Sequence, residues 1–383
     1  MCKKLLSIIF SLILIFSCTS CGTVSGLSDD SDDFAETPYD DDKDGNETQE
    51  TPSDGDETGG TEVPSDEDGD TQMEKNAVME SFFASGYFAL FADPYLTQGV
   101  SLTDANGYPN GQLLFAQSTG KPVWNFAQWY SKYDLSDYAS RSYTKDGAAF
   151  SYTSKGETVD GKFIPAKVLN IDSTNATIYM ELNTQVEYDA PRQEGEGWPH
   201  TLLSQDFSKN LVHVSELNEL IMSMDYTMTK FEDKMGDAAD ERMHCAQFVW
   251  YVTLQNRTSG SDGYGQYIWF GLNLWDNRNV GKVSAEYAAQ DLGKEDATLA
   301  FIYQPSSKKF TKTGIIPQVG EKESIRFDIL QTAQYAYELA RSRGYLPDTN
   351  WDDIYIGSMN FGFEITGTYN AAVQIDTVGI YYK

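Results

Sequence analysis

The chain is short of cysteine and histidine. Its 383 residues include 4 Cys and 3 His, and three of the cysteines lie within the first 21 residues. An exported domain in which Cys245 is the one remaining cysteine has no internal disulfide. Because Cys245 lies in an apolar run, we interpret it as a buried thiol rather than a nucleophile. The histidines are far apart and lack zinc-ligand spacing, so we expect no metal site and no cofactor.

Basic side chains are also scarce. There are 28 Lys+Arg against 58 Asp+Glu, a formal net charge of −30. Residues 29–74 hold 20 of the acids and one lysine, whereas residues 75–383 carry 25 basic and 38 acidic side chains, a net charge of −13. Such a charge is repelled by phosphate backbones and anionic lipid headgroups, which excludes nucleic acid and generic membrane surfaces as partners. It also disfavours polyanionic ligands.

Long hydrophobic runs are missing apart from one at the start. The apolar stretch Leu5–Phe16 follows two lysines, and as a helix it would rise only about 18 Å, too little for a hydrocarbon core of roughly 30 Å. We therefore predict a signal peptide over residues 1–17. A small residue before Cys18 resembles the lipobox of bacterial lipoproteins, which implies lipidation of Cys18, with Cys21 as the alternative. The chain would then be extracytoplasmic and held at the bacterial cell membrane by a lipid anchor; an ordinary secretory signal stays open.

Residues 18–75 continue from that cysteine as an acidic segment. From residue 23 onward it consists of Asp, Glu, Ser, Thr, Gly and Pro with almost no large apolar side chains. It cannot bury enough surface to offset its ordering entropy, so we predict a disordered linker, extended by its own charge. The folded domain is predicted over residues 76–383.

The main signal in that domain is the alternation of apolar and polar residues. Aromatic residues are abundant, with 24 Tyr, 20 Phe and 7 Trp in the whole chain. Period-two alternation is typical of strands with one buried face. It predicts strands at residues 177–186, 220–229, 244–255, 266–275, 298–304, 355–366 and 371–382. Helical spacing occurs once, over residues 329–343, with Gly344 placed to end the helix. Many strands and one helix predict an all-β fold, an antiparallel β-sandwich of jelly-roll type.

Several segments resemble concanavalin A-like jelly-roll domains. They are Gly197–His200, Gln205–Phe207, His244–Phe248, Gly263–Gly271, Asp276–Arg278 and Ile356–Gly367. This class includes lectin-like modules, glucanases and polysaccharide lyases. The resemblance therefore implies the sandwich fold and is compatible with carbohydrate as a ligand.

The polar faces of the predicted strands suggest a binding site for neutral glycans. Sugars are bound by flat aromatic rings beside amides and carboxylates. We predict stacking on Trp269 and Trp275, with Glu364 helping to orient the sugar. The other predicted binding residues are Tyr251, Tyr267, Gln247, Gln255, Asn273 and Asn360. Alternatively, the two tryptophans pack beneath loops.

A polysaccharide-degrading enzyme of the same fold is the second hypothesis. A glycosidase needs two carboxylates about 5–10 Å apart, and Glu364 with Asp206 or Asp276 is the candidate pair. A lyase would need a base and a group that neutralises the uronate, and the candidates for these roles are His200, Gln247, Tyr251 and Arg278. The third hypothesis is a structural or partner-binding surface protein without a sugar site. The sequence leaves the oligomeric state and the identity of the glycan open.

Overall fold

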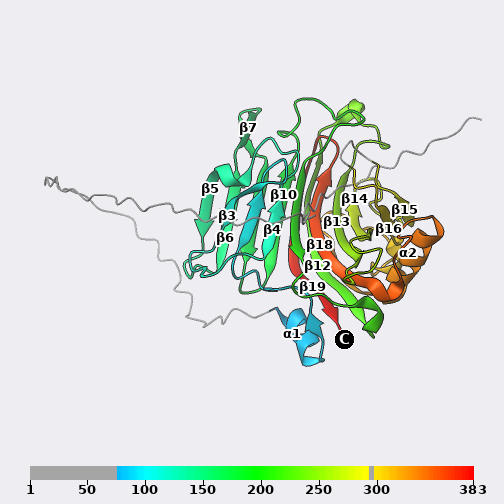
Figure 1. Cartoon of the computed structure of the whole chain (residues 1–383). Helices are drawn as coiled ribbons and strands as arrows, with labels where there is room; N and C mark the ends of the chain where they lie inside the picture. The colour runs from blue at the N-terminus through cyan, green and yellow to red at the C-terminus, as the bar shows by residue number, and fades with distance from the viewer. Residues whose placement is uncertain (1–75, 293–296) are drawn as a thin grey trace, which may run out of the picture. The chain divides into compact units, whose positions relative to one another are not determined.

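The computed structural model describes residues 76–292 and 297–383, which fold into two stacked sheets (Figure 1). The predicted signal peptide, the lipidated Cys18 or Cys21 and the acidic linker lie outside these residues, and they stay predictions. Within the described part, no helix has the length and apolar character needed to cross a bilayer.

The first sheet has eight strands and is antiparallel throughout. Its order is β17-β12-β19-β10-β9-β6-β5, and β1 pairs with β19 beside this path. The strands are β1 (Phe88–Ala89), β5 (Tyr138–Tyr143), β6 (Ala149–Ser154), β9 (Lys167–Asp172), β10 (Thr177–Asn183), β12 (Leu220–Asp233), β17 (Lys322–Asp328) and β19 (Tyr369–Tyr382).

The second sheet has nine strands in the order β15-β16-β14-β13-β18-β11-β4-β2-β3. Only the pairs β14/β16 and β2/β4 are parallel. The strands are β2 (Val100–Thr103), β3 (Pro109–Leu113), β4 (Trp124–Ala127), β11 (His200–Asp206), β13 (Ala246–Asn256), β14 (Tyr267–Asp276), β15 (Tyr287–Gln290), β16 (Phe301–Gln304) and β18 (Ile354–Ile365). A separate hairpin joins β7 (Gly156–Val159) and β8 (Lys162–Pro165).

The core lies between the two sheets and follows the predicted alternation. On β13, Phe248, Trp250, Val252 and Leu254 are fully buried in the main hydrophobic cluster. Each large apolar side chain buried in this way contributes roughly 1.5–3 kcal/mol to folding. The predicted jelly-roll sandwich is confirmed, and each predicted strand overlaps an observed one.

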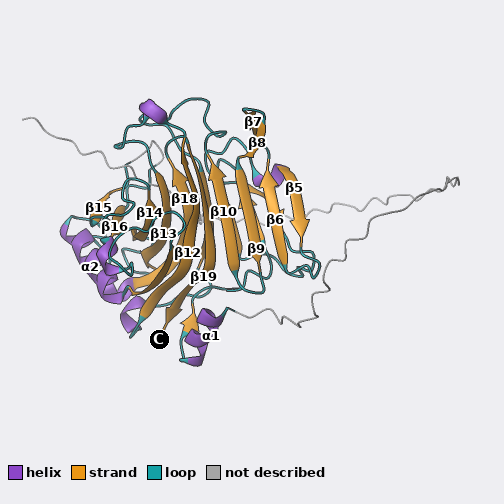
Figure 2. Ribbon diagram, turned by 180° about the vertical axis from the view of Figure 1, so that it is seen from behind, coloured by secondary structure: helices purple, strands orange, loops and turns teal. Residues whose placement is uncertain are grey.

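In the part of the chain that the structure describes, two α-helices accompany the sheets (Figure 2). The predicted helix is confirmed as α2 (Leu330–Ser342), which buries Ala333 and Tyr337 in the main cluster and ends before Gly344, whose φ is 87°. The second helix, α1 (Ala77–Ala84), was not predicted. It is short, and the sequence feature that marks its start is the single residue Asn76. The Asn76 side chain caps the helix by accepting a hydrogen bond from the Met79 amide at 3.0 Å.

The prediction that Trp275 shares a polar face with Trp269 is wrong. In the β13/β14 ladder, Phe248 pairs with Trp275 and Val249 pairs with Asn273, so Leu274 is an extra residue. This bulge breaks the alternation, and both Leu274 and Trp275 belong to the main core. Trp275 is 0% exposed, and its Nε1 donates to the Pro317 carbonyl at 3.2 Å.

Candidate functional site

The candidate site lies on the side of the nine-stranded sheet that is turned away from the sandwich core, here called the outer face. It carries a second hydrophobic cluster, separate from the main core. Its buried members are Ala127, Trp129, Trp198, Leu202, Val249, Tyr251, Trp269 and Ile302. Because side chains alternate along a strand, the residues between the core positions of β13, β14 and β18 point to this face. Helix α2 packs into the main core and not onto the outer face.

Four polar residues form one row across neighbouring strands of this face. His200 pairs with Glu364, Glu364 with Gln247, and Gln247 with Asp276. The row therefore runs from β11 through β18 and β13 to β14. Two strand spacings separate Glu364 from Asp276, which places their Cα atoms about 10 Å apart. The sequence predicted three of the four as candidate catalytic residues and one as a sugar ligand, and the fold brings them together.

Glu364 is a buried carboxylate with one unused oxygen. Its side chain is 1% exposed. Oε2 accepts a hydrogen bond from Trp198 Nε1 at 3.2 Å and lies 3.3 Å from His200 Nε2. Oε1 has no hydrogen-bond partner among the described residues. Buried polar atoms are usually paired, and leaving one unpaired costs about 1–3 kcal/mol, so this atom is a candidate for ligand contact.

Asp276, at the other end of the row, is fully occupied. Arg278 donates to it from Nε at 2.9 Å, from Nη2 at 2.6 Å and from its backbone amide at 2.9 Å. Gln247 Nε2 donates at 2.9 Å and Asn273 Nδ2 at 3.3 Å. Charge-assisted, two-pronged bonding of this kind fixes the position of the carboxylate. Asp276 therefore serves to orient its neighbours, and both of its oxygens already accept hydrogen bonds.

Tyr251 forms the floor beside Glu364. Its ring lies against Gly271, where a Cβ atom would come within 2.2 Å of the ring. Its hydroxyl accepts a hydrogen bond from Gln304 Nε2. Burial, and then the negative charge of Glu364, raise the pKa of Tyr251 well above its usual value, so the hydroxyl keeps its proton.

Aromatic rings continue from Tyr251 along the outer face. The rings of Tyr251 and Trp269 meet edge to face with centroids 6.1 Å apart, and those of Trp269 and Tyr267 with centroids 5.5 Å apart. Trp269 is 5% exposed, which agrees with the alternative that it packs beneath its neighbours. Tyr267 and Tyr287 are half-buried next to it and reach the surface.

Two amide oxygens join Glu364 Oε1 as acceptors without a donor. In residues 76–292 and 297–383, neither Asn273 Oδ1 nor Asn360 Oδ1 has a hydrogen-bond partner, although both atoms are buried. The orientation of the Asn273 amide is set by its Nδ2, which donates to Asp276. The three atoms come from β14 and β18 and are all acceptors. A ligand that fits them must supply hydrogen-bond donors.

Two predicted residues lie at the far end of the sheet. Asp206 is six residues along β11 from His200, about 20 Å away, and it pairs with Arg257 at 3.5 Å. That separation is outside the range for two catalytic carboxylates, so the geometry does not support Glu364 with Asp206. Gln255 donates to the Gly265 carbonyl at 3.2 Å. The described residues contain no group of three or more potential metal ligands.

Sequence reasoning did not assign Trp198 to the site. It lies in a segment, residues 187–199, that forms a wall of the outer face. The Tyr188 hydroxyl donates to the Ile365 carbonyl at 3.0 Å, and the Arg192 guanidinium lies 4.9 Å from the Trp198 ring centroid. The signal was present in the run Gly197-Trp198-Pro199-His200, because Trp198 comes just before the strand that carries His200.

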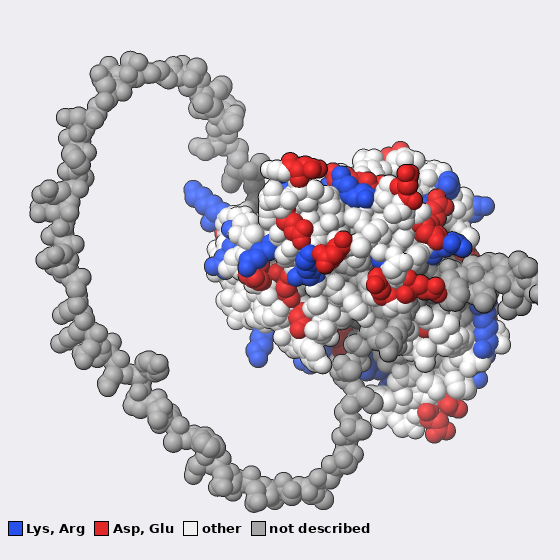
Figure 3. Space-filling view, turned by 90° about the horizontal axis from the view of Figure 1, so that it is seen from above, with Lys and Arg blue, Asp and Glu red and all other residues white. Residues whose placement is uncertain are grey.

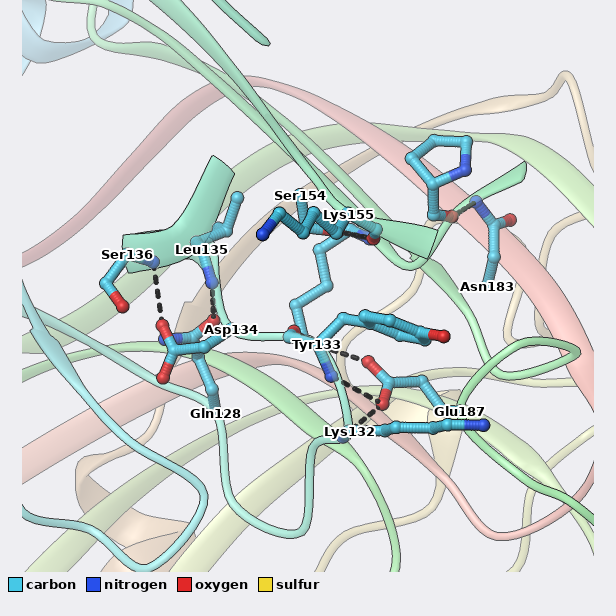
Figure 4. A network of polar contacts seen from close by, with 12 residues as sticks. Gln128, Lys132, Tyr133, Asp134, Leu135, Ser136, Ser154, Lys155, Asn183 and Glu187 are labelled. Atoms are coloured by element: carbon cyan, nitrogen blue, oxygen red, sulfur yellow. Dashed lines mark hydrogen bonds and ion pairs between the residues drawn. The ribbon is translucent and has the colours of Figure 1, made fainter. Parts of the chain in front are cut away.

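A buried ion pair fixes the start of this wall, and Figure 4 shows its carboxylate, Glu187, bonded to the loop at Lys132 and Tyr133. Lys167 and Glu187 form a salt bridge, and both side chains are 0% exposed. Lys167 Nζ also donates to the Tyr133 carbonyl at 2.6 Å, and Glu187 Oε2 accepts from the Lys132 amide at 2.5 Å. The pair thereby ties the loop at residues 132–133 to the start of the segment 187–199, which carries Trp198.

The fold and the site define a jelly-roll β-sandwich with a row of polar residues and a strip of aromatic residues on its outer face. The sequence matches no protein-family model and no curated protein. Among solved structures, it is similar to a cellulase derived from Rhodothermus marinus, with 10% identity over 68% of this chain and 100% of that chain and a TM-score of 0.35.

Two further similar structures belong to glycoside hydrolase families. A family 12 xyloglucanase from Bacillus licheniformis is 11% identical over 66% of this chain and 100% of its own, with a TM-score of 0.36. A family 11 xylanase from Neocallimastix patriciarum is 10% identical over 63% of this chain and 95% of its own, with a TM-score of 0.33. At these values the similarity assigns no activity to this chain.

Proposed function

We propose that the outer face binds a carbohydrate chain without acidic groups, and that it does so without cleaving it. The observation that carries this proposal is the set of three buried acceptors, Glu364 Oε1, Asn273 Oδ1 and Asn360 Oδ1, which have no donor among the described residues. Sugar hydroxyl groups are donors, so a bound sugar would satisfy them. Each unpaired acceptor destabilises the empty site, and a ligand that donates a hydrogen bond to it recovers that free energy on binding.

The aromatic residues support the same ligand. The half-buried rings of Tyr267 and Tyr287 adjoin Trp269 and offer flat apolar surface to the apolar face of a pyranose. Charge is mixed on the face of the molecule that Figure 3 shows. Acidic and basic side chains are interspersed there among wide neutral areas, without a basic field on that face that would attract an anionic polymer.

Binding without cleavage follows from the state of the carboxylates. Hydrolysis of a glycosidic bond needs a second carboxylate that can take part in proton transfer or attack. Asp276 already accepts from Arg278, Gln247 and Asn273. Asp206 lies at the other end of β11. Within the polar row, Glu364 is therefore the carboxylate with an oxygen that has no hydrogen-bond partner among the described residues.

Titration calorimetry with a panel of neutral oligosaccharides tests this function. Trp269→Ala removes the central ring of the aromatic strip, and we expect its affinity to fall at least tenfold. The matched control is Tyr335→Ala, because Tyr335 is an exposed aromatic residue on α2, away from the outer face. No binding by the wild type, or equal binding by wild type and Trp269→Ala, would contradict the proposal. Absence of binding would favour a structural or partner-binding role.

Hydrolysis with Glu364 as proton donor is the second candidate function. It is favoured by the register, which places Glu364 and Asp276 two strands apart on one face. The resulting separation of about 10 Å is near the upper limit for the distance between the two carboxylates of inverting glycosidases. Release of reducing ends from polysaccharides, abolished in both Glu364→Gln and Asp276→Asn, would support it. If the wild-type protein binds an oligosaccharide but releases no product, hydrolysis is contradicted and the binding function stands.

We propose further that a lipid on Cys18, or on Cys21, holds the domain at the outside of a bacterial membrane. The support is the apolar run at residues 5–16, the small residue before Cys18 and the acidic segment that follows. Mass spectrometry of the mature protein tests this. A diacylglyceryl group on Cys18, absent from Cys18→Ala, is the expected result; an unmodified mature amino terminus would contradict it.

A further inference from the structure

We infer that the sugar unit at Glu364 carries a free amino group, so that the ligand is a glycan that contains unacetylated amino sugars. This inference rests on the proposed carbohydrate-binding function and makes its ligand more specific. It follows from a difference between the two carboxylates of the polar row.

The two carboxylates differ in their positive partners. Asp276 has a permanent one, since the Arg278 guanidinium donates to both of its oxygens. For Glu364, the one basic side chain within 4.0 Å in the described part of the chain is His200, which is charged only when it is protonated. A buried carboxylate without a full cationic partner is costly, and the cost falls when a ligand brings the cation.

The geometry leaves one position for that cation. Trp198 Nε1 and His200 Nε2 both approach Oε2 of Glu364, which leaves Oε1 as the oxygen without a donor among the described residues. A hydroxyl group donates one hydrogen bond to the carboxylate there, whereas an ammonium group donates a hydrogen bond and also brings the opposite charge, so that an ion pair forms.

The surroundings of Glu364 also suit an ammonium group. The edge of Trp198 lies beside the carboxylate, to which its Nε1 donates, and the negative charge of Glu364 acts on Tyr251 at the floor of the site. An ammonium group next to this buried carboxylate would balance that negative charge. The Arg192 guanidinium on the Trp198 ring is bonded through Nε to the Glu196 carbonyl at 2.8 Å, and no ion pair joins it to Glu364 within the described residues.

The test compares three ligands of equal length that differ only at carbon 2. These are β-1,4-linked oligomers of glucose, N-acetylglucosamine and glucosamine, which carry a hydroxyl, an acetamide and an ammonium group. Titration calorimetry of the full chain should give an affinity for the glucosamine oligomer at least about tenfold above that for the glucose oligomer. Glu364→Gln keeps the shape of the side chain and should reduce this preference to about twofold or less.

The Glu364→Gln variant also controls for non-specific attraction. The chain has a formal net charge of −30, so it attracts any polycation, but this substitution changes that charge by only one unit. A preference that survives in Glu364→Gln is therefore general electrostatics and overturns the inference. Tyr335→Ala should keep the wild-type preference.

The outcomes separate this inference from the proposed function. If the wild type binds the glucose oligomer as tightly as the glucosamine oligomer, the amino-sugar inference is wrong and the carbohydrate-binding function stands. If none of these or other oligosaccharides binds, the proposed function fails and the inference fails with it. The wild-type comparison distinguishes these outcomes even if Glu364→Gln does not fold.

Discussion

Replacement of Lys167 by methionine should destabilise the domain strongly, because it leaves the Glu187 carboxylate buried without its cation. Both side chains are 0% exposed. Besides the ion pair, the change removes the hydrogen bond from Lys167 Nζ to the Tyr133 carbonyl. Removal of one partner of a buried pair costs about 3–5 kcal/mol. For a domain of this size, that corresponds to a fall in Tm of roughly 6–20 °C.

Urea unfolding of four variants measures this cost. Lys167→Met should lose about 3–5 kcal/mol in the free energy of unfolding. The double variant Lys167→Met/Glu187→Leu should be more stable than Lys167→Met, since the unpaired charge is gone, and Glu187→Leu completes the double-mutant cycle. Lys155→Met is the control, because its ion pair with Asp137 at 2.6 Å is exposed and should contribute less than about 1 kcal/mol.

Two results would refute the reasoning. The first is a loss below about 1 kcal/mol in Lys167→Met, which would mean that the carboxylate is not held as a buried charge. The second is a double variant that is no more stable than Lys167→Met. Either result would also contradict the role of this pair in fixing the segment 187–199, which forms a wall of the outer face.

The remaining predictions concern the outer face and the core beneath it. Trp275→Ala should cost about 3–5 kcal/mol in urea unfolding, because Trp275 fills the core; a smaller cost than for Trp269→Ala would argue against the bulge at Leu274. Gly271→Ala should push the Tyr251 ring from its place, at a cost of about 1–3 kcal/mol and with weaker sugar binding; unchanged affinity in calorimetry would contradict this. Burial raises the pKa of Cys245 to about 11, so at pH 8 only about one thiol in a thousand is ionised. Native wild type and Cys245→Ser should react equally with a thiol reagent and differ only in denaturant.

The core strands were predictable because their signal is local and long. Strands β12, β13, β18 and β19 each run for 11 residues or more with clear alternation. The short strands between residues 88 and 172 were not predicted, since two to six residues carry too little periodicity to stand out. β11 was also missed, although His200 and Asp206 at its ends are candidate residues. Buried residues follow one another at its start, so the alternation is blurred.

The candidate site was predictable in part, for the same reason. Tyr251, Asn273, Asn360 and Glu364 do lie on one face of the sheet, as the alternation within each strand indicated. The prediction for Trp275 was wrong because the one inserted residue, Leu274, reverses the direction of the side chains that follow it. Trp198 and Gln304 were not predicted as site residues. Trp198 reaches the face from a loop, and Gln304 reaches it from β16, the neighbour of β14 in the sheet.

The sequence by itself determined which residues share a face of one strand, where the charge lies and that a sandwich forms. These properties depend on neighbours along the chain, since side-chain direction in a strand repeats every two residues. Only the tertiary structure decided which strands are adjacent and in what register. Pairing across many residues therefore created the row His200, Glu364, Gln247 and Asp276. Asp276 has its guanidinium from Arg278, two residues along the chain, whereas Glu364 has none among the described residues. The neighbours of Glu364, on which the inferred ligand depends, come from contacts that no local pattern encodes.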